Sequence, residues 1–199
     1  MAQIYRFPEK KIKKLGYKKV RTKKKLEQEK LGQLNLFSGR TPVVKIPTKY
    51  TPFEEALIYD EKNDDRAIEY YLKAVAEKDF PADSYCNLGI IATRNEDIQK
   101  AFDYFSKALA LDARHLEAHY NLANLYFEEG DVNLAKLHYQ LALEIDPEFP
   151  NIHFNLGLVF MMIEDYDNAV ASLRNFKLLV PPEKRKKADK LIKGLTGKR

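Results

Sequence analysis

The sequence is poor in cysteine: Cys86 is the only one among 199 residues. A single cysteine cannot form an intramolecular disulfide, and it leaves no cysteine pair for a structural zinc site or a redox dithiol. Long apolar runs are absent too, since the longest, residues 157–163, is far shorter than the roughly 18 residues of a transmembrane helix. The N-terminus runs into lysines without the apolar core of a secretory signal. We therefore expect a cytoplasmic protein without a membrane span.

Catalytic motifs are missing as well. The sequence has no glycine-rich phosphate loop, no motif around a serine or cysteine nucleophile and no Cys-x2-Cys pair. His115 and His119 are spaced so that two imidazoles could bind one metal ion, with Glu117 between them. No third ligand can be named, and His119 recurs at a 34-residue interval with Tyr85 and His153, which favours a packing role. We expect no enzyme activity, no metal site and no cofactor.

Charge is distributed unevenly along the chain. Residues 1–50 contain 15 Lys and Arg against three Asp and Glu, residues 51–182 contain 11 against 24, and residues 183–199 contain eight against two. An acidic body therefore has two basic ends. Blocks of like charge stay solvated unless they meet a polyanion or an acidic surface.

A period of 34 residues runs through the acidic body. The recurring positions hold a ring (Tyr85, His119, His153), a leucine (Leu88, Leu122, Leu156), a small residue (Gly89, Ala123, Gly157) and an alanine (Ala101, Ala135, Ala169). The first three positions lie on one face of a helix, and the alanine starts the apolar face of a second helix. Turn-forming residues separate the two at 95–97, 130–131 and 164–165. Each unit is predicted to be a helical hairpin in which the small residue permits close helix contact.

These columns resemble the tetratricopeptide repeat (TPR) family, whose pattern is an aromatic residue, Leu-Gly and a second aromatic, followed by Ala-x3-aromatic. The resemblance implies an all-α TPR solenoid of about four helical hairpins with a C-terminal capping helix. The predicted organisation is a basic, largely irregular N-terminal extension that is disordered or partner-binding (1–50), a TPR array (51–183) made of a divergent repeat (51–81) and three full ones (82–115, 116–149, 150–183), and a basic capping helix and tail (184–199). Thr51 and Glu54 predict a capping box at the first helix.

The resemblance also implies a groove along the first helix of each repeat. Asn87, Asn121 and Asn155 recur in all three full repeats, and O-linked N-acetylglucosamine transferases of this family grip a peptide backbone with a similar asparagine ladder. An amide suits this task because it both donates and accepts hydrogen bonds. The alternative is that asparagine merely suits an exposed helix edge. Helical geometry adds these neighbouring groove positions: Asn124, Tyr120, Phe154, Leu158, Ile90 and Arg94.

The apolar groove positions have two interpretations. They are hydrophobic anchors for a ligand, or they are covered by the chain's own tail or by the curvature of the array. Co-chaperones of the family hold a carboxylate with a clamp that Asn124, Asn155 and Arg185 match in part. Tyr120 and Asp189 replace two of its basic residues, which disfavours that use.

The basic N-terminus carries lysines and arginines with aromatic residues between them. The basic positions are Lys10, Lys11, Lys13, Lys14, Arg21, Lys23, Lys24 and Lys25. Such a segment can contact nucleic acid, or it can be a solvated tail or fold back onto the acidic body. Residues 43–46, flanked by prolines, are expected to extend over the end of the first repeat.

Together these patterns predict a non-enzymatic protein–protein interaction adaptor that binds an extended peptide segment in the concave groove. The alternative is a nucleic-acid- or ribosome-associated protein that binds through its basic N-terminal extension.

Overall fold

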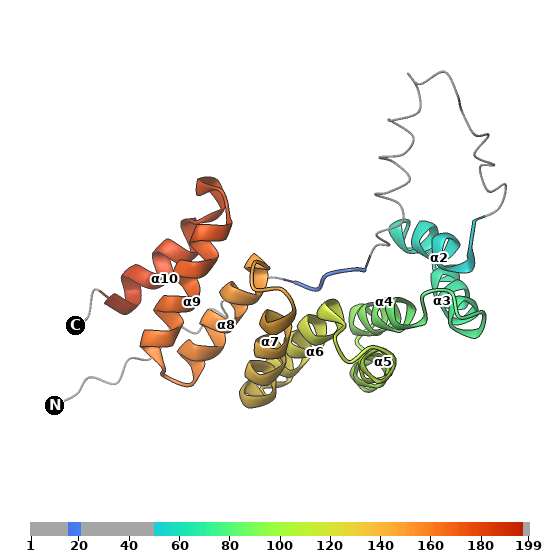
Figure 1. The fold of residues 1–199 in the computed structure, drawn as a ribbon, viewed down its shortest axis with the longest axis horizontal. Helices are drawn as coiled ribbons and strands as arrows, with labels where there is room; N and C mark the ends of the chain where they lie inside the picture. The colour runs from blue at the N-terminus through green and yellow to red at the C-terminus, as the bar shows by residue number, and fades with distance from the viewer. Residues whose placement is uncertain (1–15, 21–49, 197–199) are drawn as a thin grey trace, which may run out of the picture. The chain divides into compact units, whose positions relative to one another are not determined.

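The structure, a computed structural model, describes residues 16–20 and 50–196. In these residues it contains nine α-helices, one short 3-10 helix and no strand (Figure 1). The predicted all-α fold is thus confirmed for this part of the chain. Of the N-terminal extension, residues 1–15 and 21–49 lie outside the described residues, as does the expected extended stretch at 43–46. The chain divides into two compact units, one of residues 17–125 and one that includes residues 126–199.

The unit of residues 17–125 is built from successive antiparallel helices in which α2 packs on α3, α3 on α4, and α4 on α5. A core of fully or nearly fully buried side chains joins the first three helices, with Phe53, Tyr71 and Leu88 as its largest members. The helix bounds are α2 Pro52–Glu61, α3 Arg66–Ala76, α4 Pro81–Arg94, α5 Ile98–Leu111 and α6 Leu116–Glu129, of which residues 116–125 belong to this unit.

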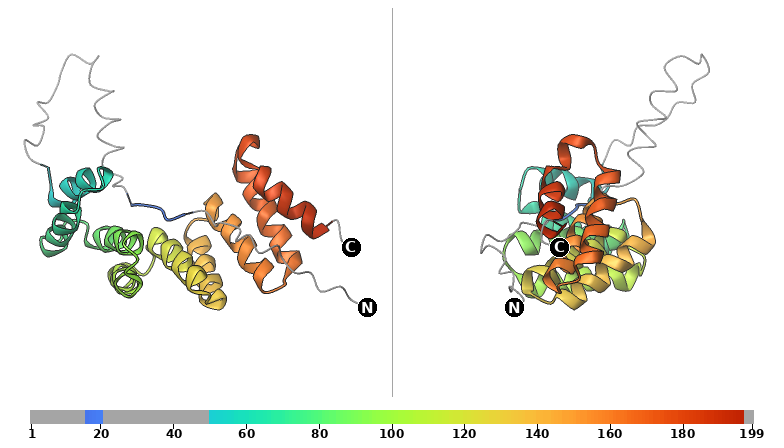
Figure 2. Two further views of the ribbon diagram at one scale, coloured as in Figure 1. Left: turned by 180° about the vertical axis from the view of Figure 1, so that it is seen from behind. Right: turned by 90° about the vertical axis from the view of Figure 1, so that its left-hand side faces the viewer.

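The second unit continues the alternation of helices. In it α7 packs on α8, α8 on α9 and α10 on α9, as the gold, orange and red helices of Figure 2 show. Lys177 of α9 and Asp189 of α10 form an ion pair between the last two helices. The bounds are α7 Val132–Ile145, α8 Pro150–Met162, α9 Tyr166–Leu179, the 3-10 helix η1 Pro182–Lys184 and α10 Lys186–Thr196.

Helix starts follow the repeat as regularly as the core does. The predicted capping box is present, because Glu54 N donates to Thr51 Oγ1 (3.3 Å) and Thr51 N donates to Glu54 Oε2 (3.0 Å). Each second helix of the three full repeats starts with an aspartate that accepts a backbone N–H one turn later: Asp97, Asp131 and Asp165, at 3.2, 3.1 and 3.2 Å. Charge-assisted caps of this kind fix where each hairpin turns.

The glycines at the small-residue position lie where two helices of a hairpin come closest. A Cβ on Gly89 would lie 2.6 Å from Cε1 of Phe105, and a Cβ on Gly157 would lie 2.9 Å from Cγ of Leu173. Both distances are well inside van der Waals contact, so the predicted close approach is confirmed in each unit.

Candidate functional site

A short segment of the N-terminal extension, residues 17–20, lies alongside α4 and α6 in the first unit (Figure 1, blue). Asn87 of α4 accepts from Val20 N (3.0 Å) and donates to Val20 O (3.2 Å). Asn121 of α6 accepts from Lys18 N and donates to Lys18 O, both at 2.9 Å. We call these two pairings the asparagine clamps.

Each clamp engages the N–H and the C=O of one residue, which is how paired residues meet in an antiparallel ladder. Residues two apart in an extended strand present these groups to the same edge, so alternate residues, Lys18 and Val20, fit two successive asparagines. The second amide hydrogen of Asn87 is used as well, in a bond to Tyr71 Oη (3.1 Å), and that of Asn121 in a bond to Cys86 Sγ (3.5 Å). Both asparagines are fully buried, and their donors are satisfied.

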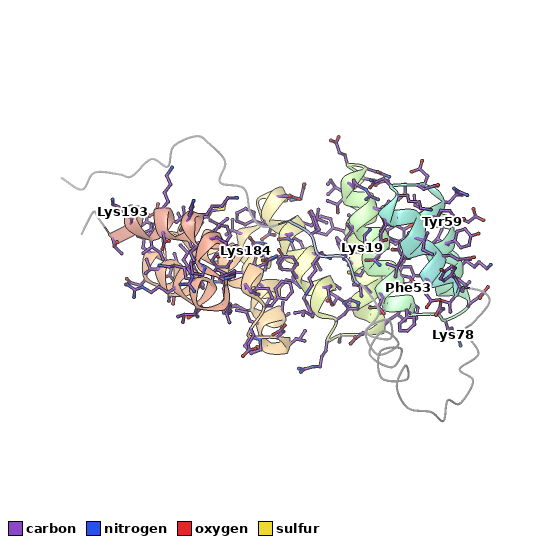
Figure 3. All side chains as sticks on the ribbon, turned by 90° about the horizontal axis from the view of Figure 1, so that it is seen from above. Lys19, Phe53, Tyr59, Lys78, Lys184 and Lys193 are labelled. Carbon is purple, nitrogen blue, oxygen red and sulfur yellow. The ribbon has the colours of Figure 1, made fainter. Side chains whose placement is uncertain are left out.

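A buried carboxylate stands next to the clamps. Asp60, at the end of α2, has a side chain only 1% exposed, and Lys19 Nζ lies 2.5 Å from its Oδ2. Tyr71 Oη donates to Oδ2 (3.2 Å), and Arg94 Nη2 lies 3.1 Å from Oδ1. Burial, and then the charge of Asp60, raises the pKa of the Tyr71 hydroxyl, which therefore remains a proton donor. Figure 3 shows Lys19 among the side chains of the green helices.

The other side chains of residues 17–20 differ in how firmly they are held. Val20 is 6% exposed, and the Tyr17 ring lies parallel to the Phe105 ring with centroids 6.5 Å apart. Lys18 is 43% exposed, and its Nζ lies 3.9 Å from Glu117. The segment is thus fixed by two backbone clamps, one buried ion pair and one buried aliphatic side chain.

The structure brings three predicted groove residues, Asn87, Asn121 and Arg94, into this network. Ile90 of the same unit is partly buried, and Tyr120 and Asn124 are fully buried. In the other unit, the remaining three are almost fully buried: Asn155, Phe154 and Leu158. The predicted nucleic-acid contacts between Lys10 and Lys25 lie outside the described residues.

Sequence reasoning missed Asp60, Lys19 and Val20. Asp60 belongs to the divergent first repeat, where no column marks it, and Lys19 is one of many lysines in a basic run. One signal in the sequence points to such partners: several polar residues lie on the first helices at positions that become buried, and a buried polar group needs a hydrogen-bonding or charged partner.

The histidines considered as metal ligands make local contacts at helix starts. His115 Nδ1 accepts from Ala118 N (3.2 Å), so its Nε2 carries the proton that faces Asp83 Oδ1 (3.2 Å). His119 Nε2 lies 3.1 Å from the Ala113 carbonyl oxygen, and His153 Nε2 lies 2.8 Å from that of Pro147. Among the described residues no group of three metal-binding side chains is found.

Comparison with known proteins gives the family. The sequence matches the description "Tetratricopeptide repeat" over residues 82–115 and "TPR repeat" over residues 123–164. The chain contains tetratricopeptide repeats. No curated protein sequence matches it. None of the helices in the described ranges combines the length and the apolar character needed to cross a membrane.

Solved structures share the TPR fold with this chain at low identity. The crystal structure of MamA is 21% identical over 71% of this chain and 84% of MamA, with a TM-score of 0.61. The Arabidopsis OM64 TPR domain is 20% identical over 60% of this chain and 97% of that domain (TM-score 0.55). A tetratricopeptide repeat protein from Parabacteroides merdae is 20% identical over 73% of this chain and 59% of its own length (TM-score 0.62). TPR domains bind other proteins, and the repeats support a role as a protein–protein interaction adaptor.

Proposed function

We propose that this TPR protein is a non-enzymatic adaptor that binds an extended peptide segment of a partner through the buried amides of its first helices. The observation that carries the proposal is the pair of asparagine clamps, in which Asn87 and Asn121 hold the backbone of Val20 and Lys18 at four hydrogen bonds. The chain's own segment supports this kind of ligand, because it is an extended backbone whose alternate residues face the helices.

The clamps contact backbone atoms only. Any extended segment without proline at the clamped positions offers the same N–H and C=O groups, so the site is not restricted to one sequence. Asn155 occupies the same repeat position in the other unit, and we propose that it binds a peptide backbone in the same way.

The test needs a chain whose own segment has been released. Lys18→Pro combined with Val20→Pro removes both N–H groups that the clamps accept, and we call this full-length double variant the opened chain. Peptides are selected on the opened chain from a random displayed library. They should bind the opened chain more tightly than they bind the parent. Asn87→Ala or Asn121→Ala in the opened chain should weaken each peptide about two- to twelvefold, the loss expected for one hydrogen-bonding group. Asn133→Ala, at an exposed asparagine of α7, is the matched control.

N-methylation of the selected peptides provides a second test on the ligand side. Methylation should weaken binding at two amides separated by one residue and should be tolerated at the amide between them. Binding that survives both asparagine substitutions and shows no alternation would contradict the proposed function.

A further inference from the structure

The side chains around the asparagine clamps favour some side chains over others in a bound segment. This inference rests on the proposed function. Asp60 is almost fully buried, and a buried carboxylate is stable only when cations and donors surround it. Arg94 comes from α4 and is 43% exposed, whereas Lys19 comes from the docked segment and is 23% exposed. The segment therefore supplies the more deeply placed of the two cations at Asp60.

The neighbouring lysine makes a useful contrast. Lys18 is 43% exposed and reaches Glu117 only at 3.9 Å, and exposed ion pairs at such distances contribute little. Val20, on the other side of Lys19, is buried. The two adjacent lysines therefore differ in their surroundings: Lys18 is largely exposed to solvent, whereas Lys19 is paired with the buried carboxylate of Asp60.

We propose that the groove selects partner segments in which a lysine directly precedes an aliphatic residue, and that residues 17–20 are an internal occupant with this sequence. The lysine enters the Asp60 site while the aliphatic residue takes the Asn87 clamp. An acidic side chain at the lysine position is repelled by Asp60, and an uncharged one leaves the carboxylate with the Arg94 guanidinium and the Tyr71 hydroxyl but without the lysine cation. A partner must displace the internal occupant, so its apparent affinity is reduced by the fraction of chains that are closed.

The experiment uses a fluorescent synthetic peptide of residues 15–22 as the probe, titrated by anisotropy against the parent and the opened chain. The opened chain should bind this peptide more tightly than the parent. Replacing the second lysine of the peptide with methionine, the Lys19→Met change, should weaken binding about ten- to hundredfold, as for a lost charge-assisted bond. The matched Lys18→Met change should cost less than about threefold.

Asp60→Asn in the opened chain provides the decisive control. It should remove the difference between the peptide with two lysines and the Lys19→Met peptide, because the two residues then no longer interact. Equal losses for both methionine peptides, unchanged by Asp60→Asn, would overturn the lysine preference. If the parent instead forms dimers in which residues 17–20 of one copy dock on the other copy, the proposal that this segment occupies its own groove would be wrong.

The outcomes separate this inference from the proposed function. If Asn87→Ala and Asn121→Ala weaken the peptide but Asp60→Asn does not couple to the lysine, the clamps stand and the preference is wrong. If the asparagine substitutions have no effect, the proposed function itself fails. Should the proline variant lose its far-ultraviolet circular dichroism, Lys19→Glu in the full chain is a second opening variant, because it places two carboxylates together at Asp60.

Discussion

Tyr71 stands at the centre of a hydrogen-bonded chain that links three elements. It receives Nδ2–H of Asn87 on α4 and donates to Asp60 on α2, while its ring is buried in the core of the first unit. The equivalent position of the next repeat is Phe105, so the packing at this position accepts a ring without a hydroxyl. The hydroxyl therefore serves the polar network and not the packing.

Tyr71→Phe should lower the free energy of unfolding by about 1–3 kcal/mol, because it leaves a buried amide hydrogen and a buried carboxylate oxygen with one partner fewer. Urea denaturation of the variant against the parent measures this cost. Tyr85→Phe, at a tyrosine that is only partly buried, is the control and should change stability by less than about 0.5 kcal/mol. Equal stability of parent and Tyr71→Phe would remove the network from the stabilising interactions.

His119 gives a prediction for the pH dependence of stability. Burial is the main cause that lowers the pKa of this imidazole, and the nearby His115 contributes in the same direction. A base with a lowered pKa in the folded state binds protons more readily in the unfolded state, so its contribution to stability is present above the unfolded pKa. That contribution is lost as the pH falls from the unfolded pKa toward the folded one.

Between about pH 8 and pH 5, the parent should therefore lose more stability than His119→Tyr, which carries the ring found at the equivalent position of the preceding repeat. Thermal denaturation across this pH range measures the effect. The contributions of the other histidines cancel when the two chains are compared. Parallel curves would show that His119 is not the group responsible.

At the scale of the helices, the close contacts at glycine give the most direct test. Gly89→Ala should cost about 1–3 kcal/mol, because the added methyl would lie 2.6 Å from the Phe105 ring. Gly157→Ala should be destabilising in the same way against Leu173. Gly194→Ala in α10, where a Cβ meets nothing within 4 Å, should be neutral or stabilising by up to about 1 kcal/mol. Thermal midpoints that rank the three variants otherwise would contradict the hairpin packing.

Much of the helical architecture is predictable from the sequence because one constraint recurs every 34 residues. In the full repeats a small residue faces a large one across the hairpin, as Gly89 faces Phe105, and an aspartate caps the second helix. The asparagines could be found for the same reason, since they too recur. The periodic pattern marks positions, but it does not mark what covers them.

The docked segment could not be predicted in the same way. Lys19 pairs with Asp60 across 41 positions of sequence, and neither residue belongs to a repeat column. In the sequence, Lys18 and Lys19 look like any others in a basic run, and only the buried surroundings of Asp60 distinguish them. A basic tail folded onto the acidic body is one of several interpretations that the sequence permits, and nothing in the sequence specifies which residues of the tail would dock.

At the scale of the whole molecule, the separation of charge along the chain distinguishes the two functions considered. Fifteen basic residues stand in the first 50, against an acidic body. Nucleic-acid binding through the extension would fall steeply and log-linearly with salt, because counterions are released. Peptide binding through buried clamps depends on short-range contacts that salt screens little.

Between about 50 and 200 mM salt, the affinity of the opened chain for a groove peptide should change by less than about fivefold. Titration of the same chain with a single-stranded RNA of unrelated sequence, under the same conditions, provides the comparison. RNA binding that is tighter than peptide binding at every salt concentration, and unaffected by Asn87→Ala, would favour the nucleic-acid function.

The reactivity of Cys86 provides a way to measure the equilibrium between the docked and the undocked state of residues 17–20. Its thiol is fully buried, it accepts from the amide hydrogen of Asn121, whose other hydrogen goes to Lys18 O, and burial raises its pKa. An alkylating reagent can therefore attack only during openings, and at low reagent concentration the modification rate is the opening constant multiplied by the rate for a free thiol. Because the chain has one cysteine, mass spectrometry can follow the alkylation of the parent over time. The rate gives the fraction of chains in which the segment is undocked, without a label or a substitution.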